Sequence, residues 1–474
     1  MTKHKVNIPI LMNNRRVLST IALLLCFSLA IVAKAPKYVF YFIGDGMAIN
    51  HVVGAQYFLG QQHSRQGMTP LCFTGFPYMG VATTFSADSD VTDSAASGTA
   101  LACGEKTVNG TVGMAANKVT PLRSIAALAK EQGKRVGIAT SVTLNHATPA
   151  TFYAHQASRN DYYEIGVELA QSGYDFFGGG DFEENINKDD KNAPELYDVA
   201  KDAGYRIVRG DKRVRGDKVI LIQDKDATEK TIPYAIDADE EALTLAEITA
   251  AAIEVLDNRK GFFLMVEGGK IDYAAHANDA ATVFHEVRGF DEAIRVAYDF
   301  YLQHPKETLI VITADHETGG LTLGSGRYAL NLPVLHAQKV SHVGFSRIVN
   351  RMRHETKDKV TWEQMREALK ENFGFWDTVV LSASDEQALY DEYERSVNNN
   401  KNVRMAKSLY YMDEPISALA VRILNRMAMV SWPVGSHTAA CVPVYAVGNG
   451  AEHFCGQMDN TDIPKRIAEM AEWK

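Results

Sequence analysis

The sequence predicts an α/β fold: a three-layer sandwich with a largely parallel central sheet covered by helices on both faces, plus a helical cap or crown-like insertion. Continuous apolar runs alternate with helical patterns, as expected for strands that are buried on both faces. Glycines follow several of these runs, as in strand-end loops. The 474 residues are 46% hydrophobic and 23% charged, which is ordinary for a globular protein with a large core.

The elements follow from this alternation, taken in chain order. Strands are expected at 37–46, 134–142, 261–269, 307–316 and 442–450, and helices at 121–133, 239–258, 281–303 and 462–473. Residues 324–432 interrupt the pattern, because they are richer in polar and charged helical stretches such as 361–372. We interpret this segment as an insertion that forms a cap. The alternative is a set of surface helices on the same core.

The first 35 residues differ from the rest of the chain. They hold five basic residues and no acid, with an apolar stretch at 17–33 and an A-x-A site at 33–35. This layout predicts a signal peptide over residues 1–35, and therefore an exported protein, periplasmic or secreted, without a membrane span after cleavage. An uncleaved anchor is one alternative. A lipoprotein signal at Cys26 is another, but Leu25 stands where a small residue is expected.

The charge balance excludes nucleic acid as a partner. The formal net charge is −9, and removal of residues 1–35 would make it −14, since those residues carry five basic groups and no acid. A nucleic-acid binder needs a basic excess to neutralise phosphates. A small-molecule substrate is therefore expected.

Four cysteines remain after residue 35: Cys72, Cys103, Cys441 and Cys455. An exported protein permits disulfides, and four cysteines allow three pairings. Cys441 and Cys455 are close enough in sequence to pair, and buried free thiols are the alternative. Because the chain has no C-x-x-C pair, a thiolate zinc site is not expected.

Acids and histidines collect where the predicted strands end. Ligands bind beyond the carboxyl ends of the strands in open α/β sheets. The residues concerned are Asp45, Glu267, Asp272, His276, Asp315 and His316, and His437 lies near the start of the last predicted strand. The spacing of Asp272 and His276 puts both side chains on one face of a helical turn. Mixed carboxylate and imidazole ligands favour zinc at an open catalytic site, and oxygen ligands favour magnesium.

Ser94 is the candidate nucleophile. It stands before a run of small residues that predicts a helix start, where backbone N–H groups favour an anion. An N-cap serine is the simpler interpretation of this residue by itself. A serine nucleophile needs a base or a metal to activate it, and no G-x-S-x-G elbow is present. Zinc held by the carboxylates and histidines would supply that activation.

Taken together, the motifs resemble those of the alkaline phosphatase family. They cover most of residues 37–450 in the family order, and their joint occurrence is specific although each alone is weak. The motifs are FIGDGM (42–47), TDSAAS (92–97), HATPA (146–150), SR (158–159), EGGKIDYAAH (267–276), TADHETGG (313–320) and SHT (436–438).

The resemblance implies a site with two Zn²⁺ and one Mg²⁺. It assigns Asp272, His276 and His437 to the first zinc, Asp45, Asp315 and His316 to the second, and Asp45, Thr148 and Glu267 to magnesium. Ser94 would be the nucleophile and Arg159 the phosphate-binding guanidinium. The implied reaction is hydrolysis of phosphate monoesters to an alcohol and inorganic phosphate through a phosphoserine, with broad specificity. Two zinc ions and an Arg fork suit a phosphoryl group chemically.

Three neighbours of the implied site are also of interest. Asp93 precedes the nucleophile. His146 occupies a position that is a carboxylate in some members of the family, and Tyr273 occupies one where basic residues are common. Imidazole is a better ligand for zinc or cobalt than for magnesium, so we expect a third site that can also accept Zn²⁺ or Co²⁺.

The resemblance also implies that residues 36–474 form the catalytic domain, with the crown-like insertion at 324–432, and it allows a homodimer. Two other functions compete with it. A phosphodiesterase or nucleotide pyrophosphatase of the same superfamily usually carries a Thr nucleophile and lacks the third metal site. A catalytically silent metal-binding surface protein would not need Ser94 or Arg159.

Overall fold

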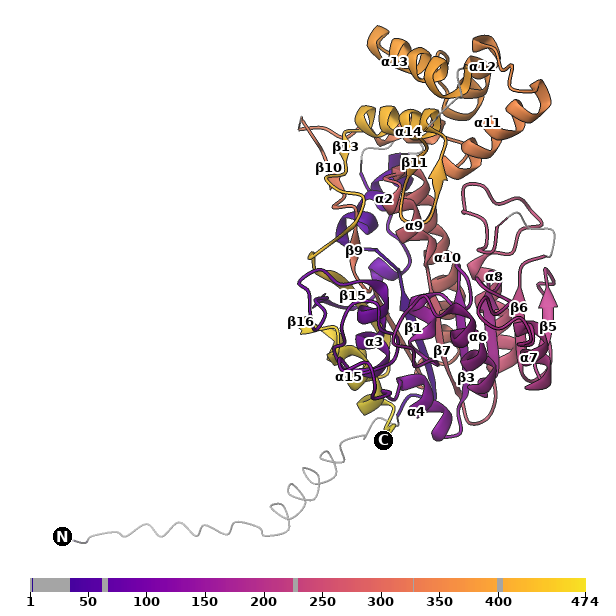
Figure 1. Cartoon of the computed structure of the whole chain (residues 1–474). Coiled ribbons are helices and arrows are strands. Elements are labelled where there is room, and N and C mark those ends of the chain that lie inside the picture. The colour runs from indigo at the N-terminus through magenta and orange to yellow at the C-terminus, as the bar shows by residue number, and fades with distance from the viewer. Residues whose placement is uncertain (1, 3–34, 62–66, 225–228, 327, 399–403) are drawn as a thin grey trace. The chain divides into compact units, whose positions relative to one another are not determined.

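The computed structural model describes residue 2 and residues 35–61, 67–224, 229–326, 328–398 and 404–474 (Figure 1). The predicted signal peptide, with its alternatives, lies outside these residues except at its two ends. By contacts the chain divides into residues 1–35 and residues 36–474, and only the second unit is described further. No helix in the described part of the chain has the length and apolar character that a bilayer span requires.

A ten-stranded sheet forms the centre of this unit, in the order β16-β2-β15-β8-β1-β7-β3-β4-β6-β5. Within it only β15 runs antiparallel to its neighbours, so the predicted α/β class with a largely parallel sheet is confirmed. The strands are β1 (Tyr38–Ile43), β2 (Tyr78–Thr83), β3 (Arg135–Thr140), β4 (Phe176–Gly179), β5 (Arg206–Arg209), β6 (Val219–Ile222), β7 (Phe262–Glu267), β8 (Thr308–Thr313), β15 (Val442–Gly448) and β16 (Gly456–Asp459).

Helices cover both faces of the sheet. Alternate residues of β7 show the two layers: the ring of Phe262 packs on Phe300, and the ring of Phe263 packs on Phe152 and Trp473. One layer holds α2 (Ile49–Gln61), α8 (Leu245–Leu256) and α10 (Ala280–Gln303). The other layer holds α3 (Ser94–Cys103), α4 (Ile125–Glu131), α5 (Ala147–Ala150) and α15 (Asp462–Met470). Two further helices, α6 (Tyr162–Gln171) and α7 (Leu196–Asp202), pack on each other, and α7 contacts β5.

Several elements are shorter than the sequence predicts, and capping residues explain the difference. The helix predicted from residue 239 begins at Leu245, because Thr244 caps it by accepting the Glu247 N–H at 3.2 Å. The helix predicted from residue 121 begins at Ile125 after the Ser124 cap. The helices predicted at 281–303 and 462–473 are found at Ala280–Gln303 and Asp462–Met470. The strands predicted at 37–46 and 307–316 also end early, at Ile43 and Thr313, and the loops that follow them carry Asp45, Asp315 and His316.

Residues 324–432 fold mainly as helices. These are α11 (His342–Thr356), α12 (Trp362–Phe373), α13 (Ala383–Tyr393) and α14 (Pro415–Met427), which Figure 1 shows together in orange to yellow, with the 3₁₀ helix η2 (Leu332–Ala337). A short antiparallel pair of β10 (Thr322–Leu323) with β13 (Val430–Ser431) joins the two ends of the segment. That this segment acts as a cap stays a prediction.

The four cysteines after residue 35 are unpaired. Cys441 and Cys455 are exposed, whereas Cys72 and Cys103 are partly buried. The structure therefore contains neither the Cys441–Cys455 bridge nor four buried thiols.

Candidate active site

The register of the sheet brings acidic side chains to one edge. Ile43 of β1 pairs with Glu267 at the end of β7 and with Thr313 at the end of β8. Asp45 and Asp315 each follow their strand by two residues, so all three carboxylates lie side by side, fully buried. Their position beyond the carboxyl ends of parallel strands is where this class of fold binds ligands.

The turn after β1 depends on glycine. Gly46 has φ of 73°, and a Cβ atom at this residue would lie 2.8 Å from the Thr318 hydroxyl and 3.0 Å from the Asp272 carboxylate. The Gly46 N–H donates to Asp315 Oδ1 at 3.1 Å. The tight turn thus lets Asp45 and Asp272 approach the same point.

His276 and His437 form the first histidine pair of the site. His276 lies on the short helix α9 (Lys270–His276), four residues after Asp272, and His437 lies on β14 (His437–Thr438), which pairs with β9 (Glu317–Thr318). His276 Nδ1 donates to Gly435 O at 2.7 Å, and His437 Nδ1 donates to Thr92 O at 2.8 Å. These bonds leave the Nε2 lone pair of each neutral ring free.

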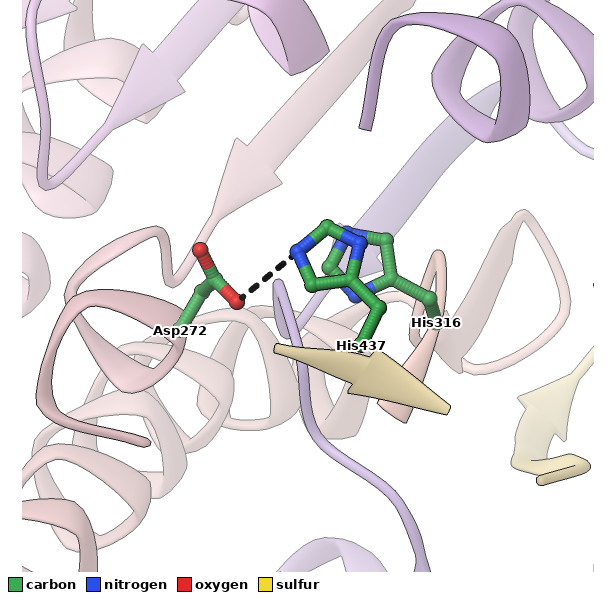
Figure 2. Close-up of side chains that lie close together, drawn as sticks. All are labelled: Asp272, His316 and His437. Carbon is green, nitrogen blue, oxygen red and sulfur yellow. Dashed lines mark ion pairs between the residues drawn. The ribbon is translucent and has the colours of Figure 1, made fainter. Parts of the chain in front are cut away.

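The two free Nε2 atoms face each other at a distance of 3.1 Å. Two lone pairs at this distance repel unless a cation lies between them. Asp272 completes the group, with Oδ2 at 3.3 Å from His276 Nε2. Its Oδ1 is 3.7 Å from His437 Nε2, the ion pair that Figure 2 marks. Imidazoles held through Nδ1–H···O=C bonds are typical of metal ligands, so this geometry suits a divalent metal.

A second group lies next to the first. His316 Nε2 is 3.3 Å from both Asp45 Oδ1 and Asp315 Oδ2, and the His316 ring stacks on His437 at 3.6 Å between centroids. Ser94 Oγ is 3.1 Å from the same His316 nitrogen. The candidate nucleophile therefore adjoins a cluster that could hold a metal.

The start of α3 positions Ser94. Asp93 is the N-cap, and its Oδ1 accepts the Ala96 N–H at 3.0 Å. Ser94 is the first helical residue and is fully buried. Backbone N–H groups at a helix start favour a bound anion, which fits a site for phosphate.

A third group joins Asp45, His146 and Glu267, whose ligand atoms lie within 4.8 Å of one another. Thr148 belongs to the same place, since its hydroxyl donates to Asp45 Oδ2 at 3.4 Å. The sequence predicts Asp45, Thr148 and Glu267 as ligands and His146 as a neighbour. In the structure His146 has the geometry of a ligand as well, because its Nδ1 lies 3.9 Å from Glu267 Oε1.

Arg159 lies between Asp93 and His146. Its Nη1 donates to Asp93 Oδ2 at 3.0 Å, and its Nη2 donates to His146 Nε2 at 3.2 Å. The Arg159 guanidinium therefore lies next to Asp93, which precedes Ser94, and next to the third group. Tyr273 flanks the same region, with its ring edge-on to His146 at 5.8 Å.

The electrostatics of the site require a positive partner. Burial and the neighbouring carboxylates raise the pKa of Asp45 and of Asp315 well above the ordinary value, and burial raises that of Glu267 to about 7. Among the acids and histidines of the site, five buried atoms have no hydrogen-bond partner in the described part of the chain: Asp45 Oδ1, His146 Nδ1, Glu267 Oε1, Asp272 Oδ2 and Asp315 Oδ2. All five belong to the three groups, so the residues present fit bound metal ions.

Three residues of the site were not predicted from the sequence. The Thr318 hydroxyl donates to Asp272 and lies 3.3 Å from His316 Nδ1, and the Thr140 hydroxyl donates to Glu267. The position of Thr140 at the end of an apolar run could have indicated its role. The third residue is Tyr410, which belongs to the 324–432 segment and lies outside the family motifs.

The chain matches known proteins over most of its length. The family model described as alkaline phosphatase matches residues 36–473. The chain belongs to the alkaline phosphatase family. Members of this family are metal-dependent phosphomonoesterases. That dependence suits the clusters of possible ligands at this site, which are Asp272 with His316 and His437, Asp45 with Asp315 and His316, and Asp45 with His146 and Glu267.

Individual alkaline phosphatases match over most of the chain. Alkaline phosphatase 3 of Bacillus subtilis (strain 168) is 30% identical over 455 residues, which cover 92% of this chain and 89% of that protein. The crystal structure of a cold-active alkaline phosphatase from a psychrophilic Shewanella sp. has a TM-score of 0.77 at 29% identity, covering 92% and 99% of the two chains.

A second similar structure contains a metal ion. It is a mutant of the TAB5 alkaline phosphatase in which a histidine is replaced by aspartate, with Mg bound in the M3 site. It has a TM-score of 0.63 at 25% identity and covers 93% of this chain and 99% of its own.

Proposed function

We propose that this phosphomonoesterase works through a phosphoserine on Ser94, at a site for two zinc ions and one magnesium ion. The observation that carries the proposal is the pair of Nε2 atoms of His276 and His437, which are 3.1 Å apart. Beside this pair, His316 Nε2 lies 3.1 Å from Ser94 Oγ. Free imidazole lone pairs and buried carboxylates are the ligands that zinc prefers at catalytic sites.

The metal ligands follow from the three groups. Asp272, His276 and His437 would hold one zinc, and Asp45, Asp315 and His316 the other. Asp45, Thr148 and Glu267 would hold the third ion, with His146 beside them. When bound, the ions supply Lewis acidity that stabilises the attacking and leaving oxygens of the phosphoryl transfer.

The residues of the chain would bind and orient the phosphoryl group. Arg159 would turn its Nη atoms toward two phosphoryl oxygens, which match its planar fork. Ser94 Oγ would attack phosphorus in line, forming the Oγ–P bond as the P–O bond to the alcohol breaks. Water would then attack the phosphoserine, which releases Ser94 and inorganic phosphate.

The third site is proposed to take magnesium loosely and to accept zinc or cobalt. The support is the orphan nitrogen His146 Nδ1, 3.9 Å from Glu267 Oε1, since imidazole favours zinc and cobalt over magnesium. In the TAB5 enzyme, the variant with aspartate in place of a histidine has Mg in its M3 site. That precedent makes an aspartate at residue 146 the natural test.

Three broader properties belong to the same proposal. Residues 36–474 would form the catalytic domain with the 324–432 cap. The basic, apolar N-terminus would direct export to the periplasm or the medium. The enzyme would act on small phosphate monoesters of broad structure, as a monomer or as a homodimer.

A rate comparison tests the proposal. Purified protein would be assayed with a chromogenic phosphomonoester, a phosphodiester and a sulfate ester, with metal analysis of the same sample. We expect a fast monoester rate that a chelator abolishes. A dominant diester rate would favour the related phosphodiesterases, and the absence of all three rates from metal-loaded protein would favour a silent metal-binding protein.

A further inference from the structure

A hairpin of the 324–432 segment reaches the metal-binding groups. Its strands are β11 (Ala406–Lys407) and β12 (Met412–Asp413), and residues 408–411 form the connection. Two recesses lie beside this connection, of about 370 Å³ and about 540 Å³, and Leu409 lines both. His146 and Tyr410 line the first recess, and His276 lines the second. The hairpin thus lies between the two recesses that border the site.

The ring of Tyr410 is held by aromatic contacts. It stacks on Tyr273 with 3.5 Å between centroids and an interplanar angle of 13°. It also lies edge-on to His146 at 5.9 Å and to His276 at 5.5 Å. Tyr410 therefore lies between the third group and the first histidine pair.

The hydroxyl of Tyr410 has no hydrogen-bond partner among the described residues, although it is buried. Burial raises the pKa of Tyr410 well above its ordinary value, and the charges that affect it next are those of Asp272, Arg159 and Asp45. The ring contact with His146, whose Nε2 accepts from Arg159, puts Tyr410 on the same side of the site as the guanidinium. A buried hydroxyl without a partner is unfavourable, so a ligand is expected to accept its hydrogen bond.

The hairpin is fixed immediately after Tyr410, at Tyr411 and at Asp413. The Tyr411 hydroxyl donates to Glu229 Oε2 at 3.0 Å and accepts from Lys270 Nζ at 3.0 Å, and this lysine is fully buried. Asp413 Oδ2 accepts from His342 Nδ1 at 2.9 Å. These anchors hold the Tyr410 hydroxyl in place before a substrate arrives, which lowers the entropic cost of a further hydrogen bond.

We propose that the Tyr410 hydroxyl is a substrate-binding group that donates a hydrogen bond to a non-bridging phosphoryl oxygen next to Arg159. The 324–432 segment would then contribute directly to phosphate recognition. This inference rests on the proposed phosphomonoesterase site.

The test compares Tyr410→Phe with the wild-type enzyme loaded with zinc and magnesium. Phenylalanine keeps the stack on Tyr273 and removes only the oxygen. We expect the inhibition constant for inorganic phosphate to rise about tenfold, as expected for the loss of a hydrogen bond to a charged group. The KM for a chromogenic monoester should rise by a similar factor, with unchanged metal content and melting temperature.

Tyr390→Phe is the matched control, because it removes a tyrosine hydroxyl from an exposed position on α13, in the same 324–432 segment but outside the hairpin. It should leave the phosphate inhibition constant unchanged. An unchanged inhibition constant in Tyr410→Phe, or equal effects of both variants, would overturn the inference. A wild-type enzyme without monoesterase activity would instead refute the proposed function, so the two failures are distinguishable.

Discussion

At the scale of single residues, the site depends on which nitrogen each histidine leaves free. His276 and His437 use Nδ1 for backbone carbonyls and present Nε2 to the metal-binding groups. His146 is reversed, because its Nε2 accepts from Arg159 and its Nδ1 faces Glu267. A neutral ring that accepts at Nε2 carries its proton on Nδ1. His146 therefore has to change tautomer, and release Arg159, before its Nδ1 can bind a metal.

The first prediction concerns Ser94. We expect Ser94→Ala to lower kcat for monoesters by orders of magnitude, because it removes the oxygen that attacks phosphorus. Zinc content should stay close to that of the wild type, since no metal group includes Ser94. Metal analysis and steady-state rates on one sample check both statements. A wild-type-like rate in the alanine variant would rule out the covalent route.

The second prediction concerns His146. Aspartate would add a negative charge beside Asp45 and Glu267, and oxygen ligands suit magnesium better than imidazole does. We expect activity of the purified wild type to rise on addition of magnesium. His146→Asp should reach half of its maximal activity at a magnesium concentration lower by about tenfold or more, since an added carboxylate strengthens a hard-cation site.

Magnesium titrations of activity for both proteins provide the measurement, with zinc held constant. His155→Asp is a suitable control, because this partly exposed histidine pairs with Glu168 and belongs to none of the three groups. Superimposable curves for the wild type and His146→Asp would make His146 a bystander.

At the scale of elements, the central strands and the helices around them were predictable because their patterns are local. A continuous apolar run such as Tyr38–Ile43 identifies a buried strand, whereas the helical pattern from residue 239 overshoots the true start of α8, which the capping box of Thr244 and Glu247 sets. The β11–β12 hairpin was not predictable, because each strand has two residues and its position depends on contacts with distant elements. Tyr410 was missed for this reason.

The third prediction concerns Glu286 on α10. Its carboxylate accepts the Ala235 N–H at 2.6 Å, and burial raises its pKa from the ordinary value of 4.5 to about 7. Between these two values the folded protein keeps a proton that the unfolded chain has lost. Stability therefore falls as the pH rises through this window and stays at the lower level above it.

Glu286→Gln removes the ionisation and keeps the acceptor oxygen. The melting temperature of Glu286→Gln minus that of the wild type should be larger at pH 8 than at pH 5. The corresponding gain in free energy of unfolding should be a few kcal/mol at most, at about 1.4 kcal/mol per pKa unit. Glu292→Gln on the same helix is half exposed and should show no such pH-dependent difference. Melting curves at the two pH values check this, and parallel shifts of both variants would contradict it.

At the scale of the whole molecule, the sheet concentrates negative charge at one edge of a dry interior. Asp45, Glu267, Asp272 and Asp315 have no exposed surface. Their convergence could be predicted from the sequence, because the carboxyl ends of parallel strands meet and the family motifs mark the residues. Their exact partners could not, since Thr318 and the hairpin approach from other parts of the chain. The fold therefore holds a charge arrangement that is favourable only with cations present.

The last prediction follows from this arrangement. Chelation should abolish the activity and lower the melting temperature by several degrees, because buried carboxylates and imidazoles lose their counter-charges. Ligand binding to the folded state stabilises it by about 2.7 kcal/mol per site at a hundredfold excess over Kd. Added zinc should therefore raise the melting temperature progressively, and magnesium should add to that effect once zinc is saturating.

The metal-free protein should also respond to pH in a defined direction. Burial, followed by the neighbouring carboxylates, raises the pKa of Asp45 and of Asp315. Groups whose pKa is raised on folding stabilise the folded state at low pH and lose that contribution as the pH rises. Bound metal ions neutralise these carboxylates as protons do at low pH. The difference in melting temperature between metal-loaded and chelated protein should therefore be larger at pH 9 than at pH 6. A gap that is constant with pH, measured by calorimetry on both forms, would show that these carboxylates do not depend on metal for their burial.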